Sequence, residues 1–507
     1  MPPTAARSVA KNTFLLTLGL LGGRVLAVFV TKKMTPILGP EGLGIWGFAN
    51  DLGIIVLTVV NFGLGVLLTR EVTRNRGSSW PLLWAALRLR WLLGLGCFLL
   101  LWLYLDTTAK DALTTTAVLV TALGLFAETT AMACDSVLQA HEKVEYQTWG
   151  QLASAVVYFW LSYWWLDLGW GIMGVIWANV VSRIVRLGVM APLMFWKTGP
   201  WRRALPGEPI IGMRAMLKLG VALCMATTFG IISYKIDTVM LTEMMGQAAT
   251  GIYVLGHRAL DIMLIVPNLF ATAIFPALMR YTERDQTDAR RLSERGLRYM
   301  VVVMLPLTWL VGLAARPVIE WFARGTDAAD PSQFADSIVV LQLVIWGVPF
   351  QSASNLLNRT LIAAGRERVF IGIGLWALVT NVALNLLLIP RWGYYGASVA
   401  TVVCLAQTMV LHVWNVNRTG LRTPVRRALV LPAAVLAVSW FAAVAVLRLV
   451  QPGWTQGWFG LATDRGWLAF GGGTALWLVF YAVAAYVLRV VDRDDLALLP
   501  QLVRRGG

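Results

Sequence analysis

The sequence predicts an all-α integral membrane protein with about 14 transmembrane helices. Of its 507 residues, 58% are hydrophobic and only 14% are charged, whereas a soluble globular protein carries about 25% charged residues. Apolar stretches of about 20 residues, the length that spans a bilayer, also recur along the whole chain and are separated by short polar loops. Most of the protein surface is therefore expected to face lipid.

The expected helices follow one another at intervals of about 35 residues, counting each helix with its loop. The first is expected to stay in the protein rather than to be cleaved as a signal peptide. The reason is that Arg24 interrupts its apolar run and no small-residue cleavage site follows. The expected spans are 11–31, 44–69, 81–105, 112–137, 149–167, 172–196, 214–236, 248–279, 297–322, 336–361, 369–389, 395–416, 428–450 and 466–489.

The basic residues are distributed unevenly over the predicted loops. The net charge is +16. With the N-terminus inside, about 27 of the 43 Lys and Arg fall in loops and tails on the cytoplasmic side, the positive-inside pattern of membrane proteins. The excess charge is therefore expected to meet anionic lipid headgroups rather than nucleic acid. We expect a multi-pass protein of a bacterial or archaeal cell (inner) membrane with both termini in the cytoplasm.

Two pairs of short segments match across the chain. Residues 39–46 read GPEGLGIW and residues 246–253 read GQAATGIY, which places Gly44 opposite Gly251. The sequences GIMG and GYYG form a second pair, and each enters the last helix of a six-helix unit. The order of these matches indicates two pseudo-symmetric six-helix lobes related by an axis along the membrane normal, with the substrate path between them.

This repeat divides the chain into three parts. We expect a first lobe of helices 1–6 in residues 1–206, a second lobe of helices 7–12 in 207–427, and a C-terminal helix pair with a cytoplasmic tail in 428–507. The pair is expected to pack beside the second lobe and to offer an apolar groove for a lipid tail.

Several sequence features that enzymes and pumps carry are absent. The chain contains no G-x-x-x-x-G-K-[ST] phosphate-binding loop and no H-E-x-x-H, and its three histidines are scattered. The expected external loops are too short to form a catalytic domain, which disfavours a membrane glycosyltransferase or polymerase. We therefore expect a transporter that is not an enzyme and that holds no metal or other cofactor; coupling to H⁺ or Na⁺ stays open.

Three parts of the sequence resemble the polysaccharide transporter family, the O-antigen and oligosaccharide flippases of the multidrug/oligosaccharidyl-lipid/polysaccharide (MOP) exporter superfamily. The first runs from Ala10 to Thr73 and contains an Asn-Thr start, the turn LGPEGLGI, and FGLG shortly before TREV. The second is KIDTVML from residue 235, followed by GIY and IFP. The third is NVALNLLLIP from residue 381, followed by GYYGA. The resemblance covers most of residues 1–420.

The resemblance implies a fold like that of the multidrug and toxin extrusion (MATE) transporters, with two six-helix lobes and often two more helices. It also implies the flipping of a polyprenyl-pyrophosphate-linked oligosaccharide from the cytoplasmic to the outer leaflet by alternating access. The expected partners are this lipid-linked glycan and membrane lipids, and contacts with a glycan polymerase or assembly proteins stay open. Two alternatives are a cation-coupled multidrug exporter of the same superfamily and a flippase for the peptidoglycan precursor, whose substrate also carries pyrophosphate.

Ionisable residues inside the expected helices are candidates for the transport site, because a charge at the bilayer centre costs at least about 3 kcal/mol. Arg24, Asp51 and Arg258 lie at similar depths, roughly 10 Å inside the outer ends of their helices, and the repeat makes Asp51 and Arg258 equivalent. We expect these three to converge in a central cavity where Arg binds pyrophosphate bidentately. His257 and Asp261 complete the candidate substrate-binding set, and Asp261 can instead pair with Arg258 on its own helix.

A second group of charges lies in the first lobe. Glu128 is expected to pair with Arg183 or Arg186 within that lobe, and these three are secondary candidates for substrate binding. Asp135 lies near the cytoplasmic end of its helix and is expected to reach the interface. For both groups the structural alternative is an ion pair that joins helices and binds nothing.

Overall fold

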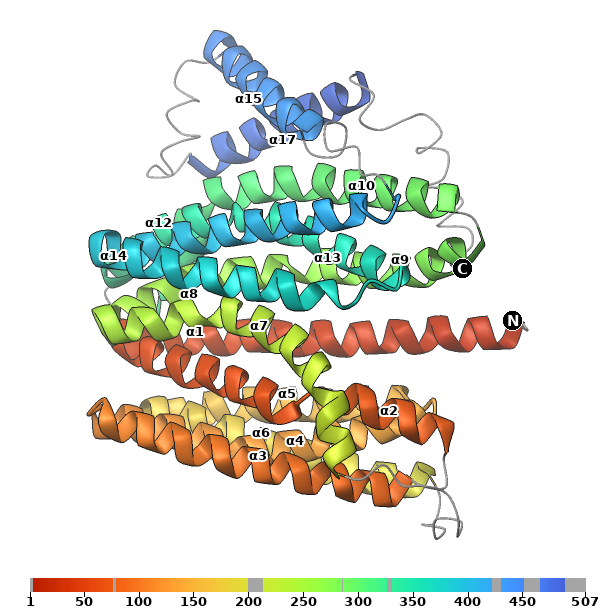
Figure 1. Cartoon of the computed structure of the whole chain (residues 1–507). Helices are drawn as coiled ribbons and strands as arrows, with labels where there is room; N and C mark the ends of the chain where they lie inside the picture. The colour runs from red at the N-terminus through yellow and green to blue at the C-terminus, as the bar shows by residue number, and fades with distance from the viewer. Residues whose placement is uncertain are drawn as a thin grey trace. The chain divides into compact units, whose positions relative to one another are not determined.

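A computed structural model of the chain describes residues 3–75, 79–198, 213–284, 286–325, 331–421, 430–450 and 466–487 (Figure 1). Within these ranges every regular element is a helix. The chain divides into two compact units. The first contains residues 1–256, 319–340 and 368–401, and the second contains the rest. The predicted division into lobes at residues 206 and 427 stays a prediction.

The helices follow the expected spans closely. The elements are α1 Pro3–Asn61, α2 Leu64–Arg74, α3 Ser79–Thr107, α4 Ala112–Ala140, α5 Glu145–Asp167, α6 Gly171–Thr198, α7 Met213–Met245, α8 Gln247–Met263, α9 Ile265–Arg284, α10 Gln286–Leu313, α11 Ala315–Ala323, η2 Pro331–Phe334, α12 Ala335–Val344, α13 Gly347–Ala363, α14 Val369–Asn417, α15 Leu431–Val450 and α17 Gly466–Val487. The predicted all-α membrane fold is confirmed.

Two of the helical stretches are too long to be single membrane spans. Among the described residues, seven stretches are long and apolar enough to cross a membrane, or eight if one bent pair counts as a span. Gly22–Arg74 and Val369–Asn417 run for 53 and 49 residues, whereas about 20 residues suffice. Gly39 and Gly393 break these stretches, with φ of 64° and 54° and non-helical ψ. Each stretch therefore supplies two spans, as the sequence predicted.

The second expected helix is interrupted by a break that is held by a buried arginine. At Phe62 and Gly63, between α1 and α2, φ is 46° and 66°. Arg90 on α3 is fully buried; its Nη2 donates to Oδ1 of Asn61 at 2.8 Å, and its Nη1 donates to the carbonyl of Thr129 at 2.7 Å. Because Asn61 is the last residue of α1, the guanidinium fixes the helix end next to the break.

The matching glycines of the sequence repeat contact each other across a helix crossing in the first unit. A Cβ atom placed on Gly44 of α1 would lie 1.8 Å from the carbonyl oxygen of Gln247, and one placed on Gly251 of α8 would lie 1.8 Å from the carbonyl oxygen of Pro40. The contact is reciprocal, because the repeat makes Pro40 equivalent to Gln247. Two glycines at equivalent positions thus let two equivalent helices touch backbone to backbone.

The C-terminal helix pair packs on α10 within the second unit. Trp440 of α15 lies with its ring centroid 4.9 Å from that of Trp309 on α10 and 6.3 Å from that of Trp477 on α17. The hydroxyl of Tyr481 donates to the carbonyl of Val302 at 2.8 Å. The expected position beside helices of residues 207–427 is therefore confirmed, whereas the groove for a lipid tail stays a prediction.

Candidate functional site

A polar cavity of about 350 Å³ lies among α1, α4, α5 and α6. These four helices pack side by side in the first unit (Figure 1). Three arginines line the cavity, whereas Glu128 is the one carboxylate among the described residues that line it. The lining residues are Gly19, Gly23, Arg24, Leu57, Glu128, Gln151, Ser154, Ala155, Tyr158, Asn179, Ser182, Arg183 and Arg186.

Small residues bring Arg24 to this cavity. Cβ atoms placed on Gly19, Gly22 and Gly23 of α1 would lie 2.4, 3.4 and 3.4 Å from side chains of α5. This glycine stripe lets α1 lie close against α5, and Arg24 follows directly after it. The Arg24 side chain is exposed and lines the cavity.

One arginine binds two carboxylates beside the cavity. Nη1 of Arg186 binds Oε1 of Glu128, and its Nη2 donates to Oδ2 of Asp135 at 2.5 Å. The expected pair within the first lobe is present, with Arg186 as the partner of Glu128. The side chain of Asp135 turns to Arg186 and is only 16% exposed, and its expected position at the membrane interface stays a prediction. With two carboxylates against three arginines, the cavity is cationic overall.

Asp51 is bound to α7. It is buried; Nζ of Lys235 lies 3.0 Å from its Oδ1, and Oγ1 of Thr238 donates to its Oδ2 at 2.8 Å. Arg24, by contrast, lies at the cavity with Glu128, Arg183 and Arg186. The structure therefore brings Arg24 together with the secondary candidates and gives Asp51 a lysine partner that the sequence analysis did not name.

The remaining predicted residues lie on α8 in the second unit. Nδ1 of His257 is 3.8 Å from Oδ2 of Asp261. His257 is buried, and Arg258 is half-buried. This contact joins Asp261 to His257, one turn earlier on the same helix, and the expected pair of Asp261 with Arg258 stays a prediction. The convergence of Arg258 with Arg24 and Asp51 stays a prediction.

A second polar cluster surrounds the buried carboxylate of Asp237 on α7. Nδ2 of Asn385 donates to Oδ1 of Asp237 at 2.6 Å, and Oγ1 of Thr401 donates to its Oδ2 at 2.5 Å. The hydroxyl of Tyr253 also donates to Oδ2, at 3.1 Å. Nδ2 of Asn385 further donates to Oδ1 of Asn381 at 2.8 Å. All five side chains are at most 3% exposed, so several oxygens meet in a dry environment.

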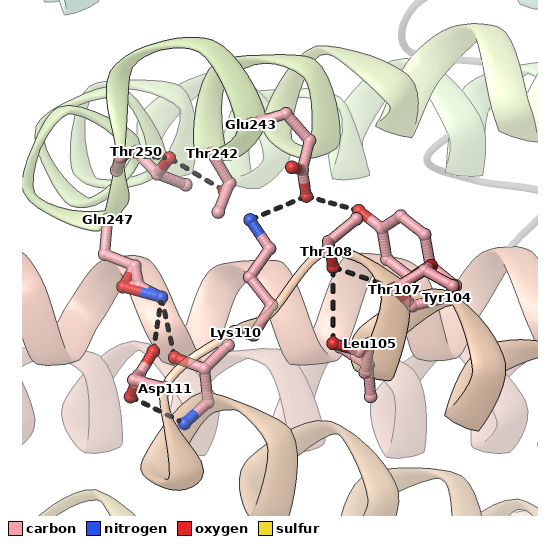
Figure 2. A network of polar contacts seen from close by, with 12 residues as sticks. Tyr104, Leu105, Thr107, Thr108, Lys110, Asp111, Thr242, Glu243, Gln247 and Thr250 are labelled. Carbon is pink, nitrogen blue, oxygen red and sulfur yellow. Dashed lines mark hydrogen bonds and ion pairs between the residues drawn. The ribbon is translucent and has the colours of Figure 1, made fainter.

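A polar network joins the ends of α3 and α4 to those of α7 and α8 (Figure 2). Glu243 accepts a hydrogen bond from Tyr104, and its Oε1 lies 2.8 Å from Nζ of Lys110. Nε2 of Gln247 donates to Oδ1 of Asp111 at 3.2 Å and to Oγ1 of Thr114 at 2.6 Å. Asp111 also caps α4 by accepting from the Thr114 amide, so the network ties two helix junctions together.

Sequence reasoning missed Arg90, Lys235 and Asp237. Lys235 and Asp237 stood inside a family motif and were not considered as buried charges, although both lie well inside a 33-residue helix. Their depth was the signal that could have identified them. Arg90 follows Arg88 in the run RLR, where the sequence does not show that one arginine is exposed and the other buried.

Comparisons with known proteins agree with this architecture. A family model described as "Polysaccharide biosynthesis protein" matches residues 9–282, and one described as "Lipid II flippase MurJ" matches residues 177–462. Each match covers more than half of the chain.

Among curated proteins, "Probable flippase AglR" of Haloferax volcanii is 25% identical over 181 residues, which are 35% of this chain and 37% of that protein. The similarity thus spans little more than a third of that relative.

Solved structures show the fold alone. "Lipid II flippase MurJ, inward closed conformation" matches with a TM-score of 0.71 and 14% identity, over 94% of this chain and 99% of that one. An inward-facing multidrug resistance MATE family transporter of the MOP superfamily matches with a TM-score of 0.63 and 16% identity, over 80% and 94%. The expected MATE-like fold is therefore confirmed.

Proposed function

Because the chain belongs to the polysaccharide biosynthesis protein family of the MOP exporter superfamily, we propose that it is a flippase for a polyprenyl-pyrophosphate-linked oligosaccharide. The glycan would move from the cytoplasmic to the outer leaflet of the cell membrane by alternating access. Membrane lipids and the lipid-linked glycan are the partners of this reaction, and the protein contributes binding rather than covalent chemistry.

The observation that carries the proposal is the cavity lined by Arg24, Arg183 and Arg186. Pyrophosphate presents oxyanions, and the planar guanidinium group binds oxyanions through two parallel hydrogen bonds. Arg186 holds Glu128 and Asp135. Nη1 of Arg183 is buried without a hydrogen-bond partner within the described residues, and the exposed side chain of Arg24 lines the cavity, so these two arginines are well placed to bind the substrate. Arg258 stays in the proposal as the residue equivalent to Asp51 in the sequence repeat.

The cationic cavity argues against a multidrug exporter with cationic cargo, since like charges brought together at low dielectric repel strongly. A flippase for the peptidoglycan precursor remains the second candidate, because the lipid II flippase model matches residues 177–462. That cargo also carries pyrophosphate, so the arginines serve both. The two differ in the glycan that the protein must accept.

The Asp237 cluster supports coupling to a cation. It assembles one carboxylate with the amide oxygens of Asn381 and Asn385 and the hydroxyl of Thr401. Oδ1 of Asn385 is buried and has no hydrogen-bond partner within the described residues. Hard cations prefer such oxygen ligands. Because the described residues contain no cluster of three or more His, Cys, Asp or Glu, a single carboxylate suits Na⁺ or H⁺ better than a divalent ion. Replacing Asp237 with Asn should abolish any stabilisation of the purified protein by NaCl over choline chloride.

Complementation of a flippase-deficient strain tests the pyrophosphate site, with membrane levels of each variant measured alongside. Replacing Arg24, Arg183 or Arg258 with Ala should remove a charge-assisted contact of about 2 kcal/mol, which weakens binding roughly thirtyfold. Arg24→Lys should also lower transport, because the ammonium group lacks the guanidinium fork. The exposed Arg366 provides the control, and Arg366→Ala should transport normally. Normal transport by all three alanine variants at normal membrane levels would place the site elsewhere.

A further inference from the structure

The cavity carries buried polar atoms of two kinds that lack partners. Within the described part of the chain, the donors Nη1 of Arg183 and Nε of Arg186 make no hydrogen bond, and neither do the acceptors Oε1 of Gln151 and Oδ1 of Asn179. Buried polar atoms of folded proteins are nearly always paired. Four such atoms on one cavity therefore indicate that a bound group completes them.

Pyrophosphate alone does not complete this set. Its oxygens accept hydrogen bonds, so they satisfy the two arginines. The oxygens of Gln151 and Asn179 need donors, which a pyrophosphate diester does not offer. Hydroxyl groups both donate and accept, so a polyhydroxylated group next to the pyrophosphate satisfies both kinds of atom.

The polar residues form one stripe on each of two helices. Gln151, Ser154 and Tyr158 occupy positions i, i+3 and i+7 of α5, and Asn179, Ser182 and Arg183 occupy positions i, i+3 and i+4 of α6. Such spacing places each set on one helix face. Asn179 lies one turn, about 6 Å, along α6 from Arg183, which is close enough for adjacent parts of one ligand.

The antiparallel course of the two helices also sets the level of each polar residue along the cavity. α5 and α6 are joined by the short turn 168–170 and run antiparallel, so Tyr158 lies near the level of Asn179. Gln151 lies near the level of Arg186, because a Cβ atom placed on the adjacent Gly150 would be 3.7 Å from Cγ of Arg186. Tyr158 and Asn179 therefore offer an aromatic ring and an amide at one level of the cavity, and Arg183 follows one turn further along α6. An apolar ring with a polar tip suits a sugar, which has both an apolar face and hydroxyl edges.

We infer that Gln151, Tyr158 and Asn179 form a sugar-binding subsite that recognises hydroxyl groups of the glycan where it joins the pyrophosphate. The inference rests on the proposed function and adds to it the residues that select the glycan. Gln151 and Asn179 accept hydrogen bonds from sugar hydroxyls, while Arg183 binds the neighbouring phosphate. Selection among glycans then depends on where these hydroxyls lie.

Isosteric variants separate recognition from structure. Gln151→Met and Asn179→Leu keep the side-chain volume but remove the buried acceptor oxygens. Oε1 of Gln407 on α14 is also buried and has no partner among the described residues, and it lies outside the lining of the cavity, so Gln407→Met is the matched control. All three substitutions should leave thermal stability unchanged or raise it, because an unsatisfied buried polar atom is costly.

The test measures binding to protein in nanodiscs with four synthetic probes. These are undecaprenyl pyrophosphate and the same carrier linked to N-acetylglucosamine, glucose or galactose. The wild type and the Gln407→Met variant should bind at least one sugar-linked carrier about tenfold more tightly than the bare carrier, which corresponds to one or two hydrogen bonds. The double variant Gln151→Met/Asn179→Leu should lose this preference and keep its affinity for undecaprenyl pyrophosphate.

Three results would overturn the subsite. Equal affinity of the wild type for all four carriers, or a full sugar preference in the double variant, would show that these residues do not select the glycan, while the proposed flippase function would still stand. Failure of the wild type to bind any of the four carriers would overturn the proposed function and the subsite with it.

Discussion

The reciprocal glycine crossing gives a prediction whose size follows from the structure. In Gly44→Ala the new methyl group would lie 1.8 Å from the carbonyl oxygen of Gln247. Since the obstacle is backbone, α1 and α8 must separate by more than about 1 Å, and the cost should reach about 3 kcal/mol, the upper end of typical overpacking costs. The melting temperature of the purified protein should fall by roughly 3 °C, because the unfolding entropy of a chain of this length is large.

A control and a double variant make this test specific. A Cβ atom on Gly188 of α6 meets nothing within 4 Å, so Gly188→Ala should be neutral or should stabilise by up to about 1 kcal/mol through helix propensity. The variant Gly44→Ala/Gly251→Ala should cost less than the sum of its single changes, because the first methyl group already opens the crossing for the second. Equal stability of Gly44→Ala and Gly188→Ala would refute the contact, and strict additivity would refute the reciprocal geometry.

Substitutions at three further polar contacts give the remaining predictions. Asp51→Leu should destabilise the protein by about 3 kcal/mol in thermal unfolding, because it leaves Lys235 without its carboxylate; a stable and active Asp51→Leu variant would contradict the Asp51–Lys235 pair. Asp51→Asn should impair conformational switching more than substrate binding, so transport should fall while the affinity for the carrier is kept. Arg90→Met should cost about 3 kcal/mol by removing two buried hydrogen bonds at the α1–α2 break, and unchanged unfolding would show that the break does not need them. In the double variant Lys110→Cys/Glu243→Cys, a short bifunctional methanethiosulfonate reagent that replaces the Lys110–Glu243 contact should block transport until a thiol releases it, if the network of Figure 2 must open. Full transport by the cross-linked protein would exclude that requirement.

The positions of the helices were predictable because the bilayer imposes a length and a composition on each span. The glycine breaks at 39 and 393 carried a sequence signal, since each glycine needs a positive φ and lies next to or near a proline. The break at Phe62 carried a weaker sequence signal, because the segment NFGLG could equally contain a helix interruption or a glycine inside a continuous helix. Its stability comes from Arg90, which is 28 residues away in the sequence.

The candidate site was predictable as a set of residue types and only partly as a set of contacts. Arg24, Glu128, Arg183 and Arg186 stood out because a charge inside a membrane helix needs a partner or a wet cavity. Which of them meet depends on helix packing. The glycine stripe before Arg24 brings this residue to α5. Predicting that contact requires knowing how α1 is aligned along α5, and the hydropathy of the sequence does not give this alignment.

The polar contacts of Asp51 and of Asp237 share helix α7. Lys235 and Asp237 are two residues apart on α7, and positions so spaced point to different sides of a helix. Lys235 binds Asp51 on α1, whereas Asp237 binds Asn385 and Thr401 on α14.

A cation bound by Asp237 would therefore act on the helix that holds α1, and α1 also carries Arg24 at the substrate cavity. Gly39 separates Arg24 from Asp51, so a displacement at Asp51 reaches Arg24 only if the break at Gly39 transmits it. Coupling through this route requires two discrete arrangements of α1 that both ligands bias. Loss of Na⁺-dependent carrier binding in Lys235→Met, with Na⁺-dependent stabilisation retained, would show that the signal passes through the Asp51–Lys235 pair.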